Sequence, residues 1–242
     1  MSELLNDIQT YWDMRAGGFS DASMEERKTA PGQRWEKIFR NSLKQGSKVL
    51  DDGCGAGFFT TLLASMGFQV TAVDYSTRML EQVKNNLAAE ELKADLLQMD
   101  VQKLEFPDNS FDVVVSRNVF WNLEHADQAY EEVSRVLKKD GILILEDGNY
   151  YRHYFSAKYE KMYQSFEKLH GDEKNQGCHA RHNKENVDFT IMDEIAKKLP
   201  MSQVDRPSWD FSKLMELGFQ KIQVEVSGRP LPMSFCIVAE KG

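Results

Sequence analysis

A glycine-rich turn within Lys48–Thr60, which reads KVLDDGCGAGFFT, is the strongest candidate for ligand-binding chemistry in this sequence. A short apolar run precedes the turn, and an apolar helical pattern follows it. Between them stand Gly53, Gly55 and Gly57 at alternate positions. Glycines adopt positive φ and let a ligand approach the backbone, while the first turn of the next helix leaves N–H groups unpaired. The pattern predicts a strand, a ligand-binding turn and a helix.

The elements around this turn are expected to bring further polar side chains to it. Strands are predicted at 69–73, 95–99, 111–115 and 142–145, with apolar helical patterns between most of them. This alternation predicts an α/β fold with a doubly wound, mostly parallel sheet and helices on both faces. Ligands of such sheets bind beyond the carboxyl ends of the strands, where the strand order reverses. We therefore expect a ligand-facing row made of Asp51, Asp74, Asp100, Ser116 and Asp147.

The remaining segments extend this repeat at both ends and interrupt it once. An amphipathic first helix is expected to end near Gly17 and Gly18, and a second helix to follow Pro31. The alternation stops at 150–205, where an aromatic helical stretch, Tyr150 to Phe166, precedes a polar segment. Apolar runs at 220–226 and 234–240 predict a C-terminal antiparallel hairpin, which makes seven strands in all. We predict a core of residues 1–149 and 206–242, with 150–205 as a helical insertion that either packs on the core or forms a lid over a substrate pocket.

Composition and charge narrow the class of partner. The formal net charge of −8 and a pI near 5.3 argue against a nucleic-acid surface, which needs clustered Lys and Arg. Three widely separated cysteines, Cys54, Cys178 and Cys236, make a disulfide framework improbable and favour a reducing compartment. Since the sequence has no secretory leader and no run of 18 apolar residues, we expect a cytoplasmic protein without a membrane partner.

The spacing of the glycines in this turn indicates which type of cofactor it can bind. Its pattern is G-x-G-x-G, and Phe58 stands where a dinucleotide-binding turn would place a small residue. This disfavours a nicotinamide cofactor. Asp74 follows the turn by about 20 residues, where a carboxylate can hold ribose hydroxyls. The glycine turn and Asp74 together fit any cofactor that contains adenosine.

Residues 46–147 resemble the class I S-adenosylmethionine-dependent methyltransferases, through VLDDGCGAG, VTAVDYSTRML, QMDVQKLEFPDNSFDVVVS and RVLKKDGILIL. The resemblance implies a Rossmann-like fold and S-adenosylmethionine as cofactor, with S-adenosylhomocysteine as product. It also implies roles along the cofactor. The methionine end would be lined by Asp51, Gly53, Gly55, Ala56 and Gly57. Asp74 would bind the ribose, and the adenosine would be flanked by Tyr75, Met79, Asp100 and Val101. Ser116 and Arg117 would lie under the sulfonium and the substrate.

Two further segments resemble methyltransferases of the menaquinone and ubiquinone type, which carry a methyltransferase type 11 domain. These are YWDMRA near the start of the chain and SRNVFWNL after the fourth strand. The resemblance implies that Tyr11, Trp12 and Arg15 close the cofactor pocket. Asp52 departs from the pattern, because it replaces an apolar strand residue, and like-charge repulsion beside Asp51 would raise the pKa of one of the two carboxyls.

Methyl transfer from a sulfonium is an in-line displacement, so positioning supplies much of the rate and a general base is needed only for a protonated acceptor. The catalytic residue is therefore left unassigned. His125, at the start of a helix, is expected to be a cap or a surface residue. Arg117 either recognises a substrate carboxylate or pairs with an acidic neighbour. The candidates for substrate contact are Trp12, Trp121, Tyr150 and His153.

Metal binding is not predicted. The motif GCHARH groups Cys178, His179 and His182, but no second pair completes a zinc site. Cys54 is expected to be a small packed residue in the turn rather than a nucleophile.

The leading hypothesis is transfer of a methyl group from S-adenosylmethionine to a small molecule. A nicotinamide-dependent oxidoreductase and a non-catalytic cofactor-binding regulatory module are the alternatives. The acceptor atom and the oligomeric state are left open.

Overall fold

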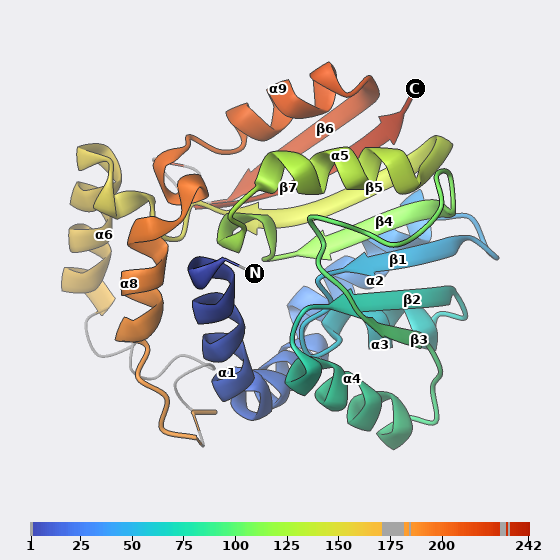
Figure 1. Cartoon of the computed structure of the whole chain (residues 1–242), viewed down its shortest axis with the longest axis horizontal. Coiled ribbons are helices and arrows are strands. Elements are labelled where there is room, and N and C mark those ends of the chain that lie inside the picture. The colour runs from blue at the N-terminus through green and yellow to red at the C-terminus, as the bar shows by residue number, and fades with distance from the viewer. Residues whose placement is uncertain (1, 171–181, 184, 228–230, 232) are drawn as a thin grey trace.

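The computed structural model describes residues 2–170, 182–183, 185–227, 231 and 233–242, and a seven-stranded sheet forms its centre (Figure 1). The strand order is β3-β2-β1-β4-β5-β7-β6. Strands β1 to β5 pair in parallel, and β7 is antiparallel to both β5 and β6. The strands are β1 (Lys48–Asp52), β2 (Gln69–Asp74), β3 (Asp95–Gln98), β4 (Phe111–Arg117), β5 (Leu137–Gly148), β6 (Phe219–Ser227) and β7 (Ser234–Lys241). The predicted doubly wound sheet with a C-terminal antiparallel hairpin is confirmed.

Helices cover both faces of the sheet. One core holds side chains of α5 and α9, and the other holds side chains of α2 and α3, which lie behind the sheet in Figure 1. The helices are α1 (Glu3–Arg27), α2 (Ala30–Ser42), α3 (Phe58–Ser65), α4 (Thr77–Ala89), α5 (Ala126–Val136), α6 (Ala157–His170), α8 (Thr190–Lys198) and α9 (Ser208–Glu216). Short 3₁₀ turns lie at η1 (Phe120–Asn122), η2 (Arg152–Tyr154) and η3 (Pro200–Gln203).

The order of the strands fixes where a ligand can bind. β1 lies between β2 and β4, so the chain winds away from β1 in opposite directions. The crossovers therefore leave a crevice at the carboxyl ends of β1 and β4, where the glycine turn follows β1. β1 and β4 are buried on both faces, which accounts for their continuous apolar runs.

Helix α1 does not end at Gly17 and Gly18, and that prediction is wrong. The helix continues to Arg27, because these glycines serve a close approach rather than a stop signal. A Cβ on Gly18 would lie 1.8 Å from the carbonyl oxygen of His182, and one on Gly17 would lie 2.2 Å from Glu185 Oε1. The amide of Gly18 also donates to Glu185 Oε1 at 3.1 Å. Gly17 and Gly18 thus leave room on α1 for His182 and Glu185.

The substitution Gly18→Ala tests this packing. Alanine favours a helix over glycine by about 1 kcal/mol, so propensity alone predicts stabilisation. We expect the opposite, a loss of about 1–3 kcal/mol, since the added methyl collides with backbone. Thermal unfolding measures the difference, and Asn85→Ala, at an exposed position of α4, is the matched control. A melting temperature that rises equally in both variants would contradict the packing role.

The segment 150–205 starts and ends at one place in the fold. Asn149 and Arg206 are joined by two hydrogen bonds, from Asn149 Nδ2 to Arg206 O at 2.7 Å and from Arg206 N to Asn149 Oδ1 at 3.3 Å. The predicted aromatic helix begins later than expected, at Ala157, because Tyr150 and Tyr151 pack on Trp121 instead. Most of the polar segment lies outside the described residues. In the part of the chain that is described, no helix is long and apolar enough to cross a bilayer.

Candidate functional site

A cavity lies beyond the carboxyl ends of β1, β2 and β4, and α1 forms its opposite wall. It encloses about 1020 Å³ of space free of atoms, part of it open to solvent. Many residues that the sequence pointed to line it: Trp12, Asp51, Gly53, Gly55, Ala56, Asp74, Tyr75, Met79, Asp100, Val101 and Arg117. The crevice expected from the strand order is therefore a cavity, and its wall contains the glycine turn.

Asp74 holds the glycine turn in place. Its Oδ2 accepts a hydrogen bond from the amide of Gly55 at 2.8 Å, and its Oδ1 accepts one from the amide of Ser76 at 2.9 Å. Ser76 in turn caps α4, because its hydroxyl accepts from the amide of Met79 at 3.0 Å. Burial raises the pKa of Asp74 to about 6, against the lowering effect of these bonds. One carboxylate thus fixes the turn and presents its remaining lone pairs to the cavity.

The turn itself requires glycine where another chain segment comes close. Gly53 has φ of +76°, and a Cβ there would lie 2.5 Å from Cγ2 of Val119. Val119 belongs to the loop that follows β4, so that loop rests directly on the turn. Gly57, by contrast, does not line the cavity. It is the N-cap residue that precedes α3, with φ of +89°, and it lies against Val83.

Two further aspartates, Asp51 and Asp100, lie on the same cavity wall as Asp74. Asp51 Oδ2 accepts from the Thr60 hydroxyl at 2.5 Å, and burial raises the pKa of Asp51 to about 7. Asp100 Oδ1 accepts from both the amide and the side-chain nitrogen of Gln102, at 2.9 and 3.0 Å. Because burial penalises the charged form of Asp51, a cationic ligand group nearby would stabilise it.

Helix α1 supplies much of the wall that sequence reasoning missed. Its other cavity-facing residues, besides the predicted Trp12, recur at helical spacing, a pattern visible in the sequence that equally fits packing on a core: Leu5, Ile8, Gln9, Phe19 and Ser23. Two hydroxyl-to-carboxylate hydrogen bonds fix the helix there, Ser2 to Glu124 and Ser76 to Asp13. The other unpredicted lining residues are Cys54, Phe58, Phe59, Ser76, Gln102, Asn118, Val119, Asn122, Leu123 and Glu124.

Tyr11 and Arg15 lie on a different face of α1 from the cavity. Arg15 is 3% exposed and places its guanidinium 4.5 Å from the ring centre of Phe189. Tyr11 is packed with side chains of α8. These two residues hold α1 against α8, so Trp12 is the member of this motif that reaches the cavity.

Arg117 is committed to protein carboxylates. It bonds Glu26 at 2.6 Å and Glu146 at 2.8 Å, and its guanidinium lies 4.1 Å from the ring centre of Phe58. The two carboxylates raise the pKa of Arg117 above its usual value, against the effect of desolvation. Of the two roles left open for Arg117, the structure shows the ion pair with acidic neighbours.

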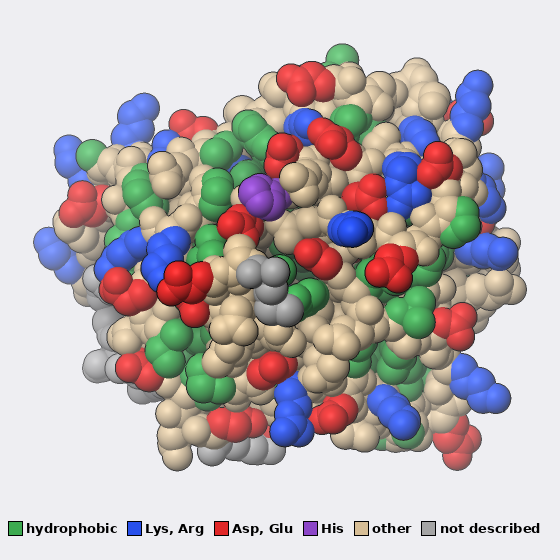
Figure 2. All heavy atoms as spheres, in the orientation of Figure 1, with side chains coloured by type: hydrophobic (Ala, Val, Ile, Leu, Met, Phe, Trp, Pro, Cys, Tyr) green, Lys and Arg blue, Asp and Glu red, His purple; other side chains and the backbone are tan. Residues whose placement is uncertain are grey.

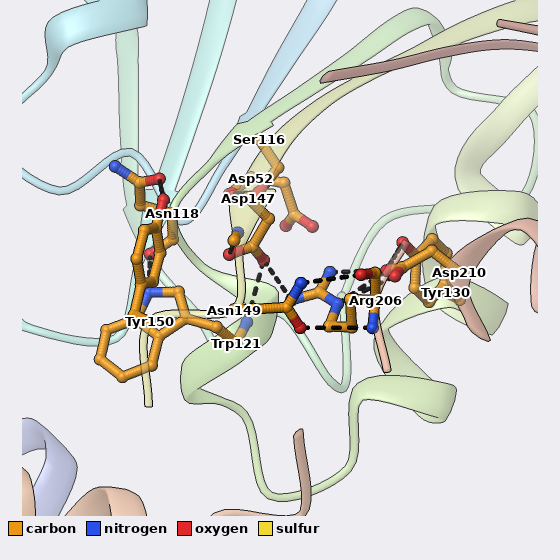
Figure 3. A network of polar contacts seen from close by, with 11 residues as sticks. Asp52, Ser116, Asn118, Trp121, Tyr130, Asp147, Asn149, Tyr150, Arg206 and Asp210 are labelled. Atoms are coloured by element: carbon orange, nitrogen blue, oxygen red, sulfur yellow. Dashed lines mark hydrogen bonds and ion pairs between the residues drawn. The ribbon is translucent and has the colours of Figure 1, made fainter. Parts of the chain in front are cut away.

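Ser116 and Asp147 end strands at the same edge of the sheet but do not line the cavity. The Ser116 hydroxyl donates to the carbonyl of Asp52 at 2.7 Å. Asp147 is fully buried, accepts from the amide of Trp121 at 2.9 Å, and lies 2.9 Å from Nη1 of Arg206 (Figure 3). The expected row of polar residues therefore divides into three that face the cavity and two that bind within the protein.

Trp121, Tyr150 and His153 also lie outside the cavity wall. Trp121 and Tyr150 contact each other edge to face, and both bind Asn118, which does line the cavity (Figure 3). His153 stacks on Tyr163, with ring centres 4.1 Å apart. Of the candidate substrate residues, Trp121 and Tyr150 thus form a second layer behind Asn118.

Asp52 is a buried carboxyl without a partner. Neither of its oxygens has a hydrogen-bond partner among the described residues, and desolvation followed by the charge of Asp51 raises its pKa well above 3.8. A carboxyl whose pKa is higher in the folded than in the unfolded protein does not lower stability through ionisation at a pH below the unfolded value. As pH rises from the unfolded towards the folded pKa, the free energy of unfolding falls progressively.

Asp52→Asn should therefore stabilise the protein at pH 8 and have little effect at pH 4. The expected gain is about 1–3 kcal/mol, the usual penalty of an unsatisfied buried group. Thermal unfolding across this pH range measures it, with Asp95→Asn at the exposed start of β3 as the control. A gain that does not change with pH would contradict the ionisation argument.

The remaining nucleophile and metal candidates have structural roles or lie outside the described residues. Cys54 points its thiol at the carbonyl of Gly55, 3.7 Å away, and burial raises the thiol pKa well above its usual value. A neutral thiol is a poor nucleophile. His125 is exposed at the start of α5, and His182 binds Glu25 at 2.6 Å. Cys178 and His179 are not among the described residues, and no group of three metal ligands occurs among those that are.

Known proteins resemble this chain in sequence and in fold. The methyltransferase domain family matches residues 50–145, which hold the glycine turn, Asp74 and Asp100. Residues 50–145 of the chain therefore carry a domain of this methyltransferase family, and the curated relatives that match are themselves named methyltransferases. S-adenosylmethionine is the cofactor of that family, as the resemblance implied.

Individual relatives cover part of the chain. YqeM of Bacillus subtilis (strain 168), a protein named as a methyltransferase, is 32% identical over 133 residues, which is 53% of each chain. A demethylmenaquinone methyltransferase of Lactobacillus johnsonii is 35% identical over 120 residues, 46% of this chain and 49% of that one. The chain spans about half the length of the curated relatives it matches. A crystal structure of a methyltransferase from Aquifex aeolicus shares the fold, with a TM-score of 0.56, 21% identity and coverage of 91% of this chain and 98% of that one.

Proposed function

We propose that this methyltransferase transfers a methyl group from S-adenosylmethionine to a small-molecule acceptor by in-line displacement. The observation that carries the proposal is the cavity whose wall joins the glycine turn to Asp74, the carboxylate that holds it. A cofactor with a sulfonium charge suits this wall, because Asp51, Asp74 and Asp100 all face the cavity.

Each side chain has a proposed task. Asp74 would accept hydrogen bonds from the ribose hydroxyls, and Asp51 would lie near the cationic amino-acid end. Tyr75, Met79 and Val101 would enclose the adenosine. Gly53 and Gly55 would let the cofactor approach the backbone. Helix α1, with Trp12 and Ile8 on the cavity, would exclude water from the reacting atoms.

The proposed chemistry needs little more than position. The sulfonium is already an activated donor, so the protein must hold an acceptor atom about 3 Å from the methyl carbon, in line with the bond that breaks. Among the described residues that line the cavity there is no His or Lys. We therefore propose an acceptor that reacts without a strong protein base, or that passes its proton to a carboxylate such as Glu124.

The partner of this reaction is proposed to be small. Figure 2 shows acidic and basic side chains interspersed on one face of the molecule, without a continuous basic patch that would suit nucleic acid. The comparisons give no support to a nicotinamide cofactor. The cytoplasmic location stays a prediction from the cysteines and composition.

Calorimetric titration with S-adenosylhomocysteine tests the proposed cofactor. We expect one site per chain, and NAD titrated under the same conditions should give no heat of binding. Release of S-adenosylhomocysteine in a screen of small-molecule acceptors would then establish turnover. A folded protein that does not bind S-adenosylhomocysteine would contradict the proposed function, and binding without turnover on any acceptor would favour the regulatory module.

A further inference from the structure

Asn118, which directly follows β4, lines the cavity, and one half of its side-chain amide is bonded within the protein. Its Oδ1 accepts a hydrogen bond from the Tyr150 hydroxyl at 2.5 Å, and its carbonyl accepts one from Trp121 Nε1 at 2.9 Å. In Figure 3 the amide nitrogen of Asn118 points away from Tyr150. Its backbone is left-handed, with φ of +59°, and is held by a bond from its amide to the carbonyl of Glu146 at 2.8 Å. Since the oxygen is occupied, Asn118 can offer a ligand an N–H donor in a fixed orientation.

Asn122 lies one turn further along the same loop, and no described residue forms a hydrogen bond to its side-chain oxygen. Only 8% of the residue is exposed, it lines the cavity, and its Oδ1 is buried without a partner. A buried amide left unpaired costs about 1–3 kcal/mol, and such groups in native structures are normally satisfied. A ligand in the cavity would supply the missing partner.

The two asparagines flank the part of the loop that touches the glycine turn. Val119 lies between them and fills the space above Gly53. The methionine end of the cofactor is proposed to lie over that turn, so the loop borders the region from which the methyl group would leave. This position suits contact with the methyl acceptor.

Charge limits the class of acceptor. Four carboxyls of described residues line the cavity: Asp51, Asp74, Asp100 and Glu124. Arg117 is the cation among the described lining residues, and it already binds both Glu26 and Glu146. An anionic acceptor would find no unpaired protein cation among these described residues, and only the sulfonium of the cofactor would offset the negative field of the carboxyls.

We propose that Asn118 and Asn122 form the acceptor subsite, and that the acceptor is a polar molecule without negative charge that bears an N–H or O–H group. Asn118 donates to an oxygen or nitrogen of the acceptor, and Asn122 pairs with its polar hydrogen. Tyr150 is a positioning residue, because its hydroxyl sets the orientation of the Asn118 amide. The inference rests on the proposed methyltransferase function and specifies its substrate class.

The experiment separates cofactor binding from acceptor binding. Binding of S-adenosylhomocysteine is measured by calorimetry for the wild type, Asn118→Ala, Asn122→Ala and Tyr150→Phe, with Asn85→Ala as the exposed control. We expect dissociation constants within about threefold of one another. Methyl transfer from labelled S-adenosylmethionine is then followed with acceptors that share one skeleton and carry an amine, an alcohol, an amide, a carboxylate or a phosphate. Product should form with the uncharged or cationic members only.

The variants should then lose acceptor use specifically. On the best acceptor, we expect Asn118→Ala and Asn122→Ala to lower kcat/KM at least tenfold. Tyr150→Phe should lower it about fivefold, mainly through KM, with an unchanged melting temperature. The inference is overturned by a tenfold loss of S-adenosylhomocysteine affinity in either asparagine variant, by product from the carboxylate or phosphate, or by no product from any uncharged or cationic member. A wild type that does not bind S-adenosylhomocysteine would instead refute the proposed function itself.

Discussion

Asp74→Ala is expected to weaken binding of S-adenosylhomocysteine roughly 100-fold, or about 3 kcal/mol, the scale of two charge-assisted hydrogen bonds. The carboxylate has two tasks at once. It accepts from the amides of Gly55 and Ser76, and it faces the cavity where the ribose is proposed to lie. Alanine removes the ligand contact and also releases the glycine turn. Calorimetry with S-adenosylhomocysteine measures the loss.

The same carboxylate predicts how binding depends on pH. The pKa of Asp74 is about 6, so protonation as pH falls through 6 removes the charged acceptor and should weaken binding. Asp51, with a pKa of about 7, acts in the same direction at slightly higher pH. Affinity should therefore be higher at pH 8 than at pH 5. Asp95→Ala, at the amino end of β3, is the control for an added or lost surface charge. Equal affinities for Asp74→Ala and the wild type would exclude the ribose role.

Arg206→Ala is expected to destabilise the protein by about 3–5 kcal/mol, which is the cost of leaving a buried ion pair with one partner. Arg206 is fully buried between Asp147 at 2.9 Å and Asp210 at 2.5 Å, and Tyr130 donates to Asp210 at 2.7 Å (Figure 3). Removing the guanidinium leaves two buried carboxylates facing each other without a cation. The melting temperature should fall by roughly 10 °C or more.

Two further variants make the ion-pair prediction decisive. Arg40→Ala breaks an exposed pair with Glu36 on α2, and about 0.5 kcal/mol is expected there. If Arg206→Ala does not fold, Asp210→Asn keeps the shape of the network and removes one charge, so its unfolding can still be measured. Arg206 also binds Asn149 through its backbone amide and carbonyl, so loss of the network should loosen the junction where segment 150–205 leaves and rejoins the core. Equal losses of stability in Arg206→Ala and Arg40→Ala would contradict the larger stabilisation expected from the buried ion pair.

Local sequence patterns were sufficient to predict the sheet and the carboxyls at the acidic end of the cavity. The run from Val49 to Gly57 predicts a strand and a turn, because an apolar run is followed by closely spaced glycines. The structure shows why Gly53 is needed there: its φ is positive and Val119 leaves no room for a Cβ. Asp74 could be placed beside that turn because the carboxyl ends of parallel strands meet at one edge. These features depend on residues close in sequence and on the period of the apolar pattern, so the sequence contains their cause.

The partners of long side chains depended on the tertiary structure. Gly17 and Gly18 have the composition of a helix stop, yet they lie within α1, because the space they leave is filled by a segment more than 160 residues away. Arg117 could pair with a substrate or with protein, and only packing brings Glu26 of α1 and Glu146 of β5 to it. Tyr11 and Arg15 were expected at the cavity, but the rotation of α1 about its axis turns them towards α8 and turns Trp12 inward.

By itself the sequence determined the α/β architecture, the glycine turn and the carboxylates that flank it, because hydrophobic period and backbone geometry act over a few residues. Only the tertiary structure decided that α1 closes the cavity, that Arg117 is already paired, and that Asn118 and Asn122 line the cavity. Those features arise where distant segments meet, and the contacts that create them follow no local pattern in the chain.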